Sequence, residues 1–464
     1  MKQNYEKGVL IVLCANLINM FISLITNFIL PRYLNIENYA IIKTFQLYVS
    51  YIGLFHMGYS DGVYLKYGGK FINEIDKEKI QLSISTMVYF QSLIAFIVMI
   101  WSIFNHNRLV MIFSIDIIGF NLIGLFKNIY QALGEFKRYA NITQLIAIIN
   151  LGINVFLIFI KHFNNAYFFI AGYTLVDMFV FIYLVYDFDK ISGLKKIQLK
   201  FSFLELITNV KDGILLLLGN LTSIILMSMD RWFTKIYMLA IDFAQYSFAV
   251  SVENLLNVAI TPVSITLYNY LCNNQEKNKI RKIQASVLVF TSIIVFAVFP
   301  IKFIVERYLN NYIDSLKVIV ILFSTQFFSV LIQSIYVNLY KAQKKQKRYF
   351  IEVLLVIIIG FILNVVFYNI HKVKESFAVG TLLSNFIWFI ICQMDYKELR
   401  LSIKQLLYLI IELSSFGIFS LGMSTFNGAV CYILLTMILC LTLLKNEIKW
   451  IIKKIIVYLR KNKM

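Results

Sequence analysis

The sequence contains few charged residues, few prolines and few cysteines for its length. Of its 464 residues, 15% are charged, three are proline and five are cysteine. A soluble domain carries about 25% charged residues, so this composition, with 59% hydrophobic residues and a mean hydropathy of +0.74, excludes a soluble chain. Apolar runs of roughly 17–25 residues, long enough to cross a bilayer, recur throughout. We therefore expect an all-α polytopic membrane protein.

Cysteine and histidine are too scattered to build a metal site or a disulfide framework. None of the cysteines forms a C-x-x-C pair, and they lie far apart at Cys14, Cys272, Cys392, Cys431 and Cys440. No gap between apolar runs is long enough for a further soluble domain, which a basic nucleic-acid groove would need. The net charge of +19 therefore does not indicate nucleic-acid binding. We expect no cofactor, no metal and no nucleic-acid partner.

Fourteen apolar segments are candidate transmembrane helices. In this arrangement, 33 of the 44 Lys and Arg residues fall on one side of the membrane. The positive-inside rule then places both termini in the cytoplasm, which requires an even number of spans. Twelve spans, with the last pair misread, is the alternative. The segments are 8–30, 38–60, 80–104, 109–131, 140–160, 166–187, 209–235, 241–270, 283–305, 314–340, 349–370, 375–394, 404–423 and 427–445.

One dodecamer occurs twice in the chain. NIYQALGEFKRY at 128–139 and NLYKAQKKQKRY at 338–349 share six identical positions at an offset of 210 residues. The match extends without a gap over 128–155 and 338–365, where 11 of 28 positions are identical. Shared apolar composition does not explain paired Asn and Lys-Arg-Tyr at fixed spacing. The repeated turn is therefore expected to hold the same place in two related bundles.

Weaker similarities link spans 1, 2 and 6 to spans 7, 8 and 12. The repeating unit is therefore a six-helix bundle, used twice in the same orientation, as in parallel-repeat transporters. We predict an N-terminal lobe at 1–190, a C-terminal lobe at 191–400, two further helices at 401–445 and a basic amphipathic cytoplasmic tail at 446–464. Two like bundles favour alternating access. A duplication retained for packing alone is the alternative.

Polar residues form stripes in spans 1, 2, 7 and 8. In span 1 they recur in steps of three and four, which places them on one helical face. Polar groups in hydrocarbon need partners or water, so stripes on corresponding spans predict one aqueous cavity, with polar contacts between packed helices as the alternative. The candidate cavity residues are Asn16, Asn19, Asn27, Arg32, Lys43, Gln46, Asn220, Asp230, Arg231, Lys235, Glu253, Asn254 and Asn257.

Four carboxylates lie deep within predicted spans, at Asp116, Asp177, Glu253 and Glu412, where an ionisable group is costly unless it is paired or hydrated. Asp116, Asp177 and Glu253 are candidates for ion coupling. For Asp116, Asp177 and Glu412, pairing with a neighbouring span is the alternative. Cations such as Lys43 and Arg231 suit an anionic phosphate or pyrophosphate, because Lys and Arg form charge-assisted hydrogen bonds with phosphate oxygens.

Four stretches carry a resemblance to a known family. PRYLNIENYA (31–40), QALGEFKRYANITQ (131–144), MDRWFTKIYMLAIDFAQYSFA (229–249) and RYLNNYIDSLKVIVIL (307–322) resemble sequences of bacterial Wzx-type flippases for polysaccharide and O-antigen repeat units. These belong to the multidrug/oligosaccharidyl-lipid/polysaccharide exporter superfamily. The resemblance implies two six-helix lobes and a hydrophilic, often cationic cavity. This chain departs in having few arginines deep in its spans.

The resemblance implies a transporter of the bacterial cytoplasmic membrane with no covalent chemistry. Its substrate would be a polyprenyl-pyrophosphate-linked oligosaccharide, translocated by alternating access for O-antigen, capsule or exopolysaccharide biosynthesis. Membrane lipids, a polysaccharide polymerase and glycosyltransferases are the expected partners. Two alternatives stay open: a cation-coupled multidrug exporter of the same superfamily, and a membrane-embedded polysaccharide polymerase or glycosyltransferase, although the short outer loops argue against the enzyme.

Overall fold

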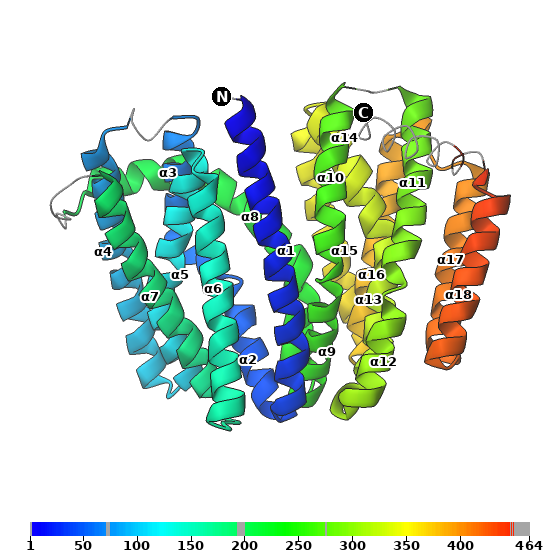
Figure 1. Cartoon of the computed structure of the whole chain (residues 1–464), viewed down its shortest axis with the longest axis horizontal. Helices are drawn as coiled ribbons and strands as arrows, with labels where there is room; N and C mark the ends of the chain where they lie inside the picture. Colours follow the sequence, from blue (N-terminus) through cyan, green and yellow to red (C-terminus); the bar gives the residue numbers. More distant parts are fainter. Residues whose placement is uncertain are drawn as a thin grey trace. The chain divides into compact units, whose positions relative to one another are not determined.

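The computed structural model describes residues 2–70, 75–192, 200–273, 276–445, 447 and 449, and their side chains from residue 18 onward except at positions 189, 191, 192, 269 and 273. Every regular element within these ranges is a helix (Figure 1), which confirms the all-α prediction. Apart from residues 447 and 449, the predicted tail at 446–464 lies outside the described residues.

The contacts divide the chain into two compact units, Met1–Ser228 and Met229–Met464. The predicted division at 190, 400 and 445 is a different one and stays a prediction. Unit 1 contains α1 (Lys2–Tyr33), α2 (Ile36–Val49), η1 (Ile52–His56), α3 (Tyr59–Tyr67), α4 (Lys77–Phe104), α5 (Arg108–Ala132), α6 (Phe136–Val155), η3 (Phe156–Ile160), α7 (Ala166–Ser192) and the first part of α8 (Phe203–Tyr237).

Unit 2 takes the end of α8 and all the elements that follow. These are α9 (Ala240–Glu253), α10 (Leu256–Asn273), α11 (Lys277–Val295), α12 (Val298–Tyr308), η4 (Asn310–Tyr312), α13 (Ser315–Leu331), η5 (Ile332–Tyr336), α14 (Val337–Ala342), α15 (Gln346–Ile370), α16 (Glu375–Asp395), η6 (Lys397–Leu399), α17 (Ile403–Gly422) and α18 (Thr425–Thr442).

Twelve helical segments among the described residues are long and apolar enough to cross a membrane. They run from Lys77–Phe104 to Thr425–Thr442 and coincide one by one with the third to fourteenth predicted spans. The first predicted span falls within α1, which is 32 residues long. The chain is thus a multi-pass membrane protein, and the count of fourteen spans stays a prediction.

The second predicted span, 38–60, is divided into α2, η1 and the start of α3. The backbone turns at Met57 and Gly58, which have left-handed φ angles of 50° and 84°. Such a pair interrupts a right-handed helix, and glycine adopts this region without strain. A continuous helix across 38–60 is therefore wrong, because the hydropathy of the segment does not register a change in backbone handedness.

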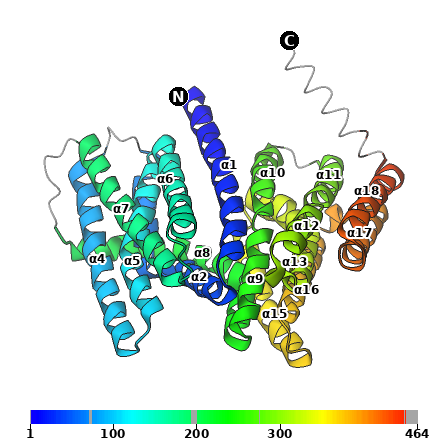
Figure 2. The same cartoon turned by 60° about the horizontal axis from the view of Figure 1, so that its bottom comes forward.

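Packing within each unit joins helices that are neighbours in the sequence as well as distant ones. In unit 1, α5 contacts both α4 and α7, and α6 contacts both α1 and α7; Figure 2 shows α4, α5, α6 and α7 side by side in one group. In unit 2, α16 packs against α15 and α13. The pair α17–α18 packs on α11, α12 and α13, where the buried Lys302 donates from Nζ to the carbonyl oxygens of Ser420 and Met423, both at 2.8 Å.

The repeated dodecamer forms the same turn in both units. Gly134 and Lys344, 210 residues apart, both have left-handed φ angles, of 73° and 55°. The residue after each donates its backbone N–H back to a tyrosine carbonyl, at Tyr130 and at Tyr340, with 2.8 Å in both cases. The sequence repeat therefore reports a repeat of backbone conformation.

The repeated side chains also make equivalent contacts. Asn128 Nδ2 donates to Ser60 Oγ at 3.0 Å, and Asn338 Nδ2 donates to Ser264 Oγ at 3.2 Å. In each unit the repeated arginine then pairs with an aspartate at the end of the next long helix. Arg138 Nη1 lies 2.6 Å from Asp187 Oδ2, and Arg348 Nε lies 2.6 Å from Asp395 Oδ2.

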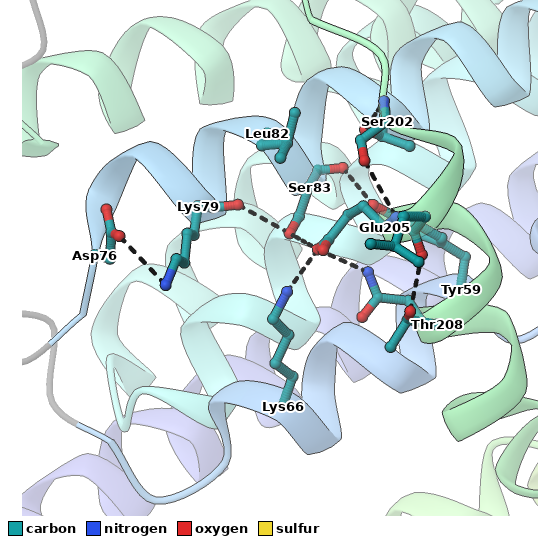
Figure 3. Close-up of polar contacts among 12 residues, drawn as sticks. Tyr59, Lys66, Asp76, Lys79, Leu82, Ser83, Ser202, Glu205 and Thr208 are labelled. Carbon is teal, nitrogen blue, oxygen red and sulfur yellow. Dashed lines mark hydrogen bonds and ion pairs between the residues drawn. The ribbon is translucent and has the colours of Figure 1, made fainter.

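The start of α8 is fixed to α3 and α4 by a single carboxylate. Figure 3 shows Lys66, Ser83 and Glu205 converging. Lys66 Nζ and Ser83 Oγ each donate to Glu205 Oε1 at 2.6 Å, and Asn209 Nδ2 donates to the same oxygen at 2.9 Å. Beside this cluster α3 meets α8 at Gly62, where a Cβ atom would lie 2.0 Å from the Asn209 carbonyl oxygen. Only glycine fits such an approach.

Candidate functional site

Unit 1 contains a cavity of about 410 Å³ between α2, α5, α6 and α7. This volume lies within the range of small-molecule sites, roughly 300–1,000 Å³. Half of its lining is apolar and includes Phe45, Val49, Phe120, Ile123 and Ile146. The polar half consists of Gln46, Asp116, Lys127, Asn150, Tyr173 and Asp177.

Asparagines at the beginnings of α2 and α7 connect these two walls of the cavity. Asn35 caps α2, because its side chain accepts from the backbone N–H of Asn38 at 2.9 Å. The Asn35 backbone N–H in turn donates to Asn164 Oδ1 at 2.9 Å, and Ala166 N–H at the start of α7 donates to Asn38 Oδ1 at 3.0 Å. The helix termini are thereby satisfied across the two elements.

A close approach of α5 and α7 brings two acidic residues together. Gly119 on α5 faces α7 so closely that a Cβ atom would lie 3.0 Å from the Asp177 carbonyl carbon. Asp116 is three residues before Gly119 and therefore on the same face of α5. The carboxyl groups of Asp116 and Asp177 interact with each other, and both line the cavity.

Two acceptor atoms at this cavity are buried without a donor. Asp116 is 2% exposed, and its Oδ1 has no hydrogen-bond partner among the described residues. The Asn150 Oδ1 is buried and unpartnered in the same way. Buried acceptors in proteins are rarely left unsatisfied. One of these acceptors belongs to the interacting carboxyl pair, and the other lines the same cavity. Together they form an arrangement that can take up a proton or a small cation.

One lysine lines this cavity, and a second is bonded to a residue of its lining. Lys127 lines the cavity and interacts electrostatically with Asp177. Lys43 on α2 is buried, with its Nζ 3.0 Å from Oε1 of the cavity residue Gln46 and 5.2 Å from the Tyr39 ring centroid. Opposite charges therefore lie at the cavity. Binding of a proton or a cation by Asp116 and Asp177 changes the net charge there.

Unit 2 has its own cluster of buried polar groups. Asp230 on α8 accepts from Tyr246 Oη at 2.7 Å and from Thr381 Oγ1 at 3.5 Å. Glu253, at the end of α9, accepts from Gln326 Nε2 at 2.7 Å, and it lies within electrostatic reach of both Asp230 and Arg231. The structure thus brings together three of the residues predicted in spans 7 and 8.

The other predicted site residues are more dispersed. Arg32, Asn220 and Asn254 are exposed, and Asn257 donates to Asn254 at 3.2 Å. Lys235 lies over the Phe243 ring at 5.2 Å. Asn19 and Asn27 are half-buried, and the side chain of Asn16 lies outside the described residues. The single cavity predicted for spans 1, 2, 7 and 8 stays a prediction.

Three cavity residues were not among the sequence candidates. The sequence places Lys127 directly before the repeated dodecamer, where we counted it only among the positive charges of the cytoplasmic side. Asn150 and Tyr173 lie in apolar runs with other polar residues, and neither belongs to the stripes of spans 1, 2, 7 and 8. Tyr173 also donates to Asn154 Oδ1 at 2.5 Å, so it links α7 to one of the repeated asparagines.

Comparison with known proteins finds likeness in structure alone. No protein-family model and no curated protein sequence matches the chain. A solved structure of the lipid II flippase MurJ, in an inward closed conformation, matches 95% of this chain and 99% of its own, with a TM-score of 0.67 and 14% sequence identity.

An inward-facing multidrug resistance MATE family transporter of the MOP superfamily matches 82% of this chain and 95% of its own. Its TM-score is 0.57 and its sequence identity 15%. The chain therefore shares the fold of these two proteins. Two of the expectations drawn from the Wzx resemblance, a membrane location and this superfamily's fold, are thereby confirmed, and the Wzx type itself stays a proposal.

Proposed function

We propose that this protein translocates polyprenyl-pyrophosphate-linked oligosaccharide repeat units across the bacterial cytoplasmic membrane by alternating access. The observation that carries the proposal is the structural likeness to a lipid II flippase over 95% of the chain. The likeness to the drug transporter covers less, 82%. The protein would act as a transporter, with both termini in the cytoplasm and no covalent chemistry.

The candidate residues fit an anionic head group attached to a sugar. Lys43 in unit 1 and Arg231 in unit 2 are each able to bind phosphate oxygens through charge-assisted hydrogen bonds. The Arg231 Nε is buried without a hydrogen-bond partner among the described residues, which leaves it available to an acceptor on the substrate. The amides of Asn19, Asn220 and Asn254 would bind sugar hydroxyls.

The acidic cavity of unit 1 would couple transport to a cation. Two carboxylates in contact repel each other when both are charged, and a proton or a sodium ion would remove this repulsion. Loading and release would then change the interactions of Asp116 and Asp177 with Lys127. Glu253 in unit 2 stays a further candidate for the same role.

Transport can be tested with the purified full chain in vesicles and a lipid-linked repeat unit labelled on its sugar. Protein-dependent arrival of the sugar at the opposite leaflet, measured by its accessibility to an external glycosidase, is the expected result. Proton and sodium gradients are imposed separately. No protein-dependent crossing under any gradient would refute the proposal.

Asp116→Asn tests the coupling. It should reduce the gradient-driven rate at least about fivefold, the factor that corresponds to the low end of typical coupling free energies, about 1 kcal/mol, while vesicle incorporation is unchanged. Asp212→Asn, at an exposed position on α8, is the matched control and should leave the rate unchanged. Equal rates for wild type and Asp116→Asn would exclude Asp116 from coupling.

The same acidic cavity is the observation that favours a second candidate, a cation-coupled multidrug exporter. Vesicles loaded with a cationic dye distinguish the two functions. Gradient-driven dye efflux without movement of lipid-linked sugar would favour the exporter. A change in glycan chain length in the same vesicles would instead indicate a polymerase.

A further inference from the structure

Unit 2 has an apolar groove between α10 and α11. These helices are consecutive in the chain, yet α10 packs mainly against η5 and α14 and touches α11 little. Asn338 contributes to the packing of α10 on α14, because its Nδ2 donates to the Ser264 carbonyl oxygen at 2.8 Å. The groove has a volume of about 350 Å³ and is lined by Val263, Thr266, Leu267, Tyr270, Ile283, Ser286, Val287 and Phe290.

The two small hydroxyl groups in the lining are turned back to their own helices. Thr266 Oγ1 donates to the Pro262 carbonyl oxygen at 2.8 Å, and Ser286 Oγ donates to the Lys282 carbonyl oxygen at 2.9 Å. Neither hydroxyl proton is therefore available to a ligand. Apart from Tyr270, which lies at one end, the groove presents carbon atoms, and a hydrocarbon chain is the chemistry that fills it with favourable dispersion contacts.

Cations continue the groove at one end. Lys279 and Lys282 each lie four residues before a groove residue, Ile283 and Ser286, so they occupy the same face of α11 about one turn further on. Both lysines are exposed. Lys279 pairs with the exposed Glu276 at 2.6 Å and interacts electrostatically with Tyr270, which places the tyrosine at the same end.

We propose that this groove binds one acyl chain of an anionic phospholipid, whose phosphate lies at Lys279 and Lys282. The apolar length and the basic end match the two parts of such a lipid. In the predicted orientation this end is cytoplasmic, where the leaflet is anionic and attracts lysine. The site lies within unit 2. Lipid binding is measured without any transport step, so its result does not depend on the proposed function.

Photo-crosslinking tests the site. The purified full chain is irradiated with phosphatidylglycerol or phosphatidylcholine that bears identical diazirine-labelled acyl chains, and the adducts are mapped by peptide mass spectrometry. We expect phosphatidylglycerol adducts on the groove faces of α10 and α11, and fewer from phosphatidylcholine. Each lysine near an anionic lipid contributes enough for about a fivefold change in binding, so Lys279→Ala and Lys282→Ala together should remove the preference.

Thr266→Trp should fill the groove and abolish the adducts. Ile265→Trp is the matched control, because Ile265 is the neighbouring residue and is 55% exposed outside the lining. Equal labelling of the wild-type protein by the two lipids would overturn the proposal, and this comparison needs no variant. Full labelling of a monodisperse Thr266→Trp protein would also overturn it. Displacement of phosphatidylglycerol by an equimolar polyprenyl phosphate would instead assign the groove to a polyprenyl chain.

Discussion

The two copies of the repeated arginine should contribute unequally to stability. In unit 2, Arg348 forms two short contacts with Asp395, Nε–Oδ2 at 2.6 Å and Nη2–Oδ1 at 2.7 Å. Its Nε also lies 3.2 Å from Oε1 of Glu352, which is 0% exposed. Arg348→Ala would therefore leave a fully buried carboxylate without its cation.

The corresponding site in unit 1 contains no such carboxylate. Arg138 makes one short contact with Asp187, and both side chains are partly exposed. Position 142, which matches Glu352 at the repeat offset, is the buried Ile142. Arg138→Ala should lower the free energy of unfolding by about 1 kcal/mol, as for a partly exposed pair. Arg348→Ala should lower it by about 3 kcal/mol, the low end for a broken buried pair, since the arginine is half-exposed.

Thermal unfolding of each purified variant in detergent, followed by intrinsic fluorescence, measures this difference. The midpoint should fall more for Arg348→Ala than for Arg138→Ala. Adding Glu352→Ile to Arg348→Ala replaces the buried carboxylate with the residue found at the matching position, Ile142, and should recover most of the loss, because Tyr340 Oη still has Asp395 as an acceptor at 3.1 Å. Equal shifts for the two alanine variants, or a further loss in the double variant, would refute the reasoning.

Two other sites give clear expectations. Gly62→Ala should lower stability by about 3 kcal/mol, the upper end for overpacking, since its Cβ would overlap the α8 backbone; Gly124→Ala is the control, with no atom within 4 Å of its Cβ. The yield of monodisperse protein compares them, and equal yields would contradict the close approach. Lys43→Ala and Arg231→Ala should impair complementation of a flippase-null strain with membrane insertion intact; full complementation by both would remove them from the site.

Much of the fold follows from hydropathy and repetition. Twelve predicted spans coincide with helices, because a segment that must bury its backbone in hydrocarbon has to be both apolar and helical. The repeat at 128–139 and 338–349 marked a turn that both units form. The break at Met57–Gly58 was not predicted, because it depends on a left-handed backbone and on how closely α3 packs against α8.

The candidate site was harder to predict. Asp116 and Asp177 were each identified from their depth in an apolar span, but their contact depends on α5 meeting α7 at Gly119. A glycine within a span gives no indication of which helix approaches it. Lys127 contributes to the charge asymmetry of the spans, and that count does not show that its side chain also lines a cavity. These relations are set by packing between distant segments, which a single sequence does not encode locally.

The acidic pair has a consequence for the history of the chain. At the repeat offset, Gln326 stands where the first copy has Asp116, and in the weaker match between spans 6 and 12, Asn385 stands where it has Asp177. An amide has a similar shape to a carboxylic acid and does not change its charge with proton uptake. The two repeats have therefore diverged in charge at these two positions: the first has two carboxylic acids, and the second has two amides, of which Gln326 donates to the carboxylate of Glu253.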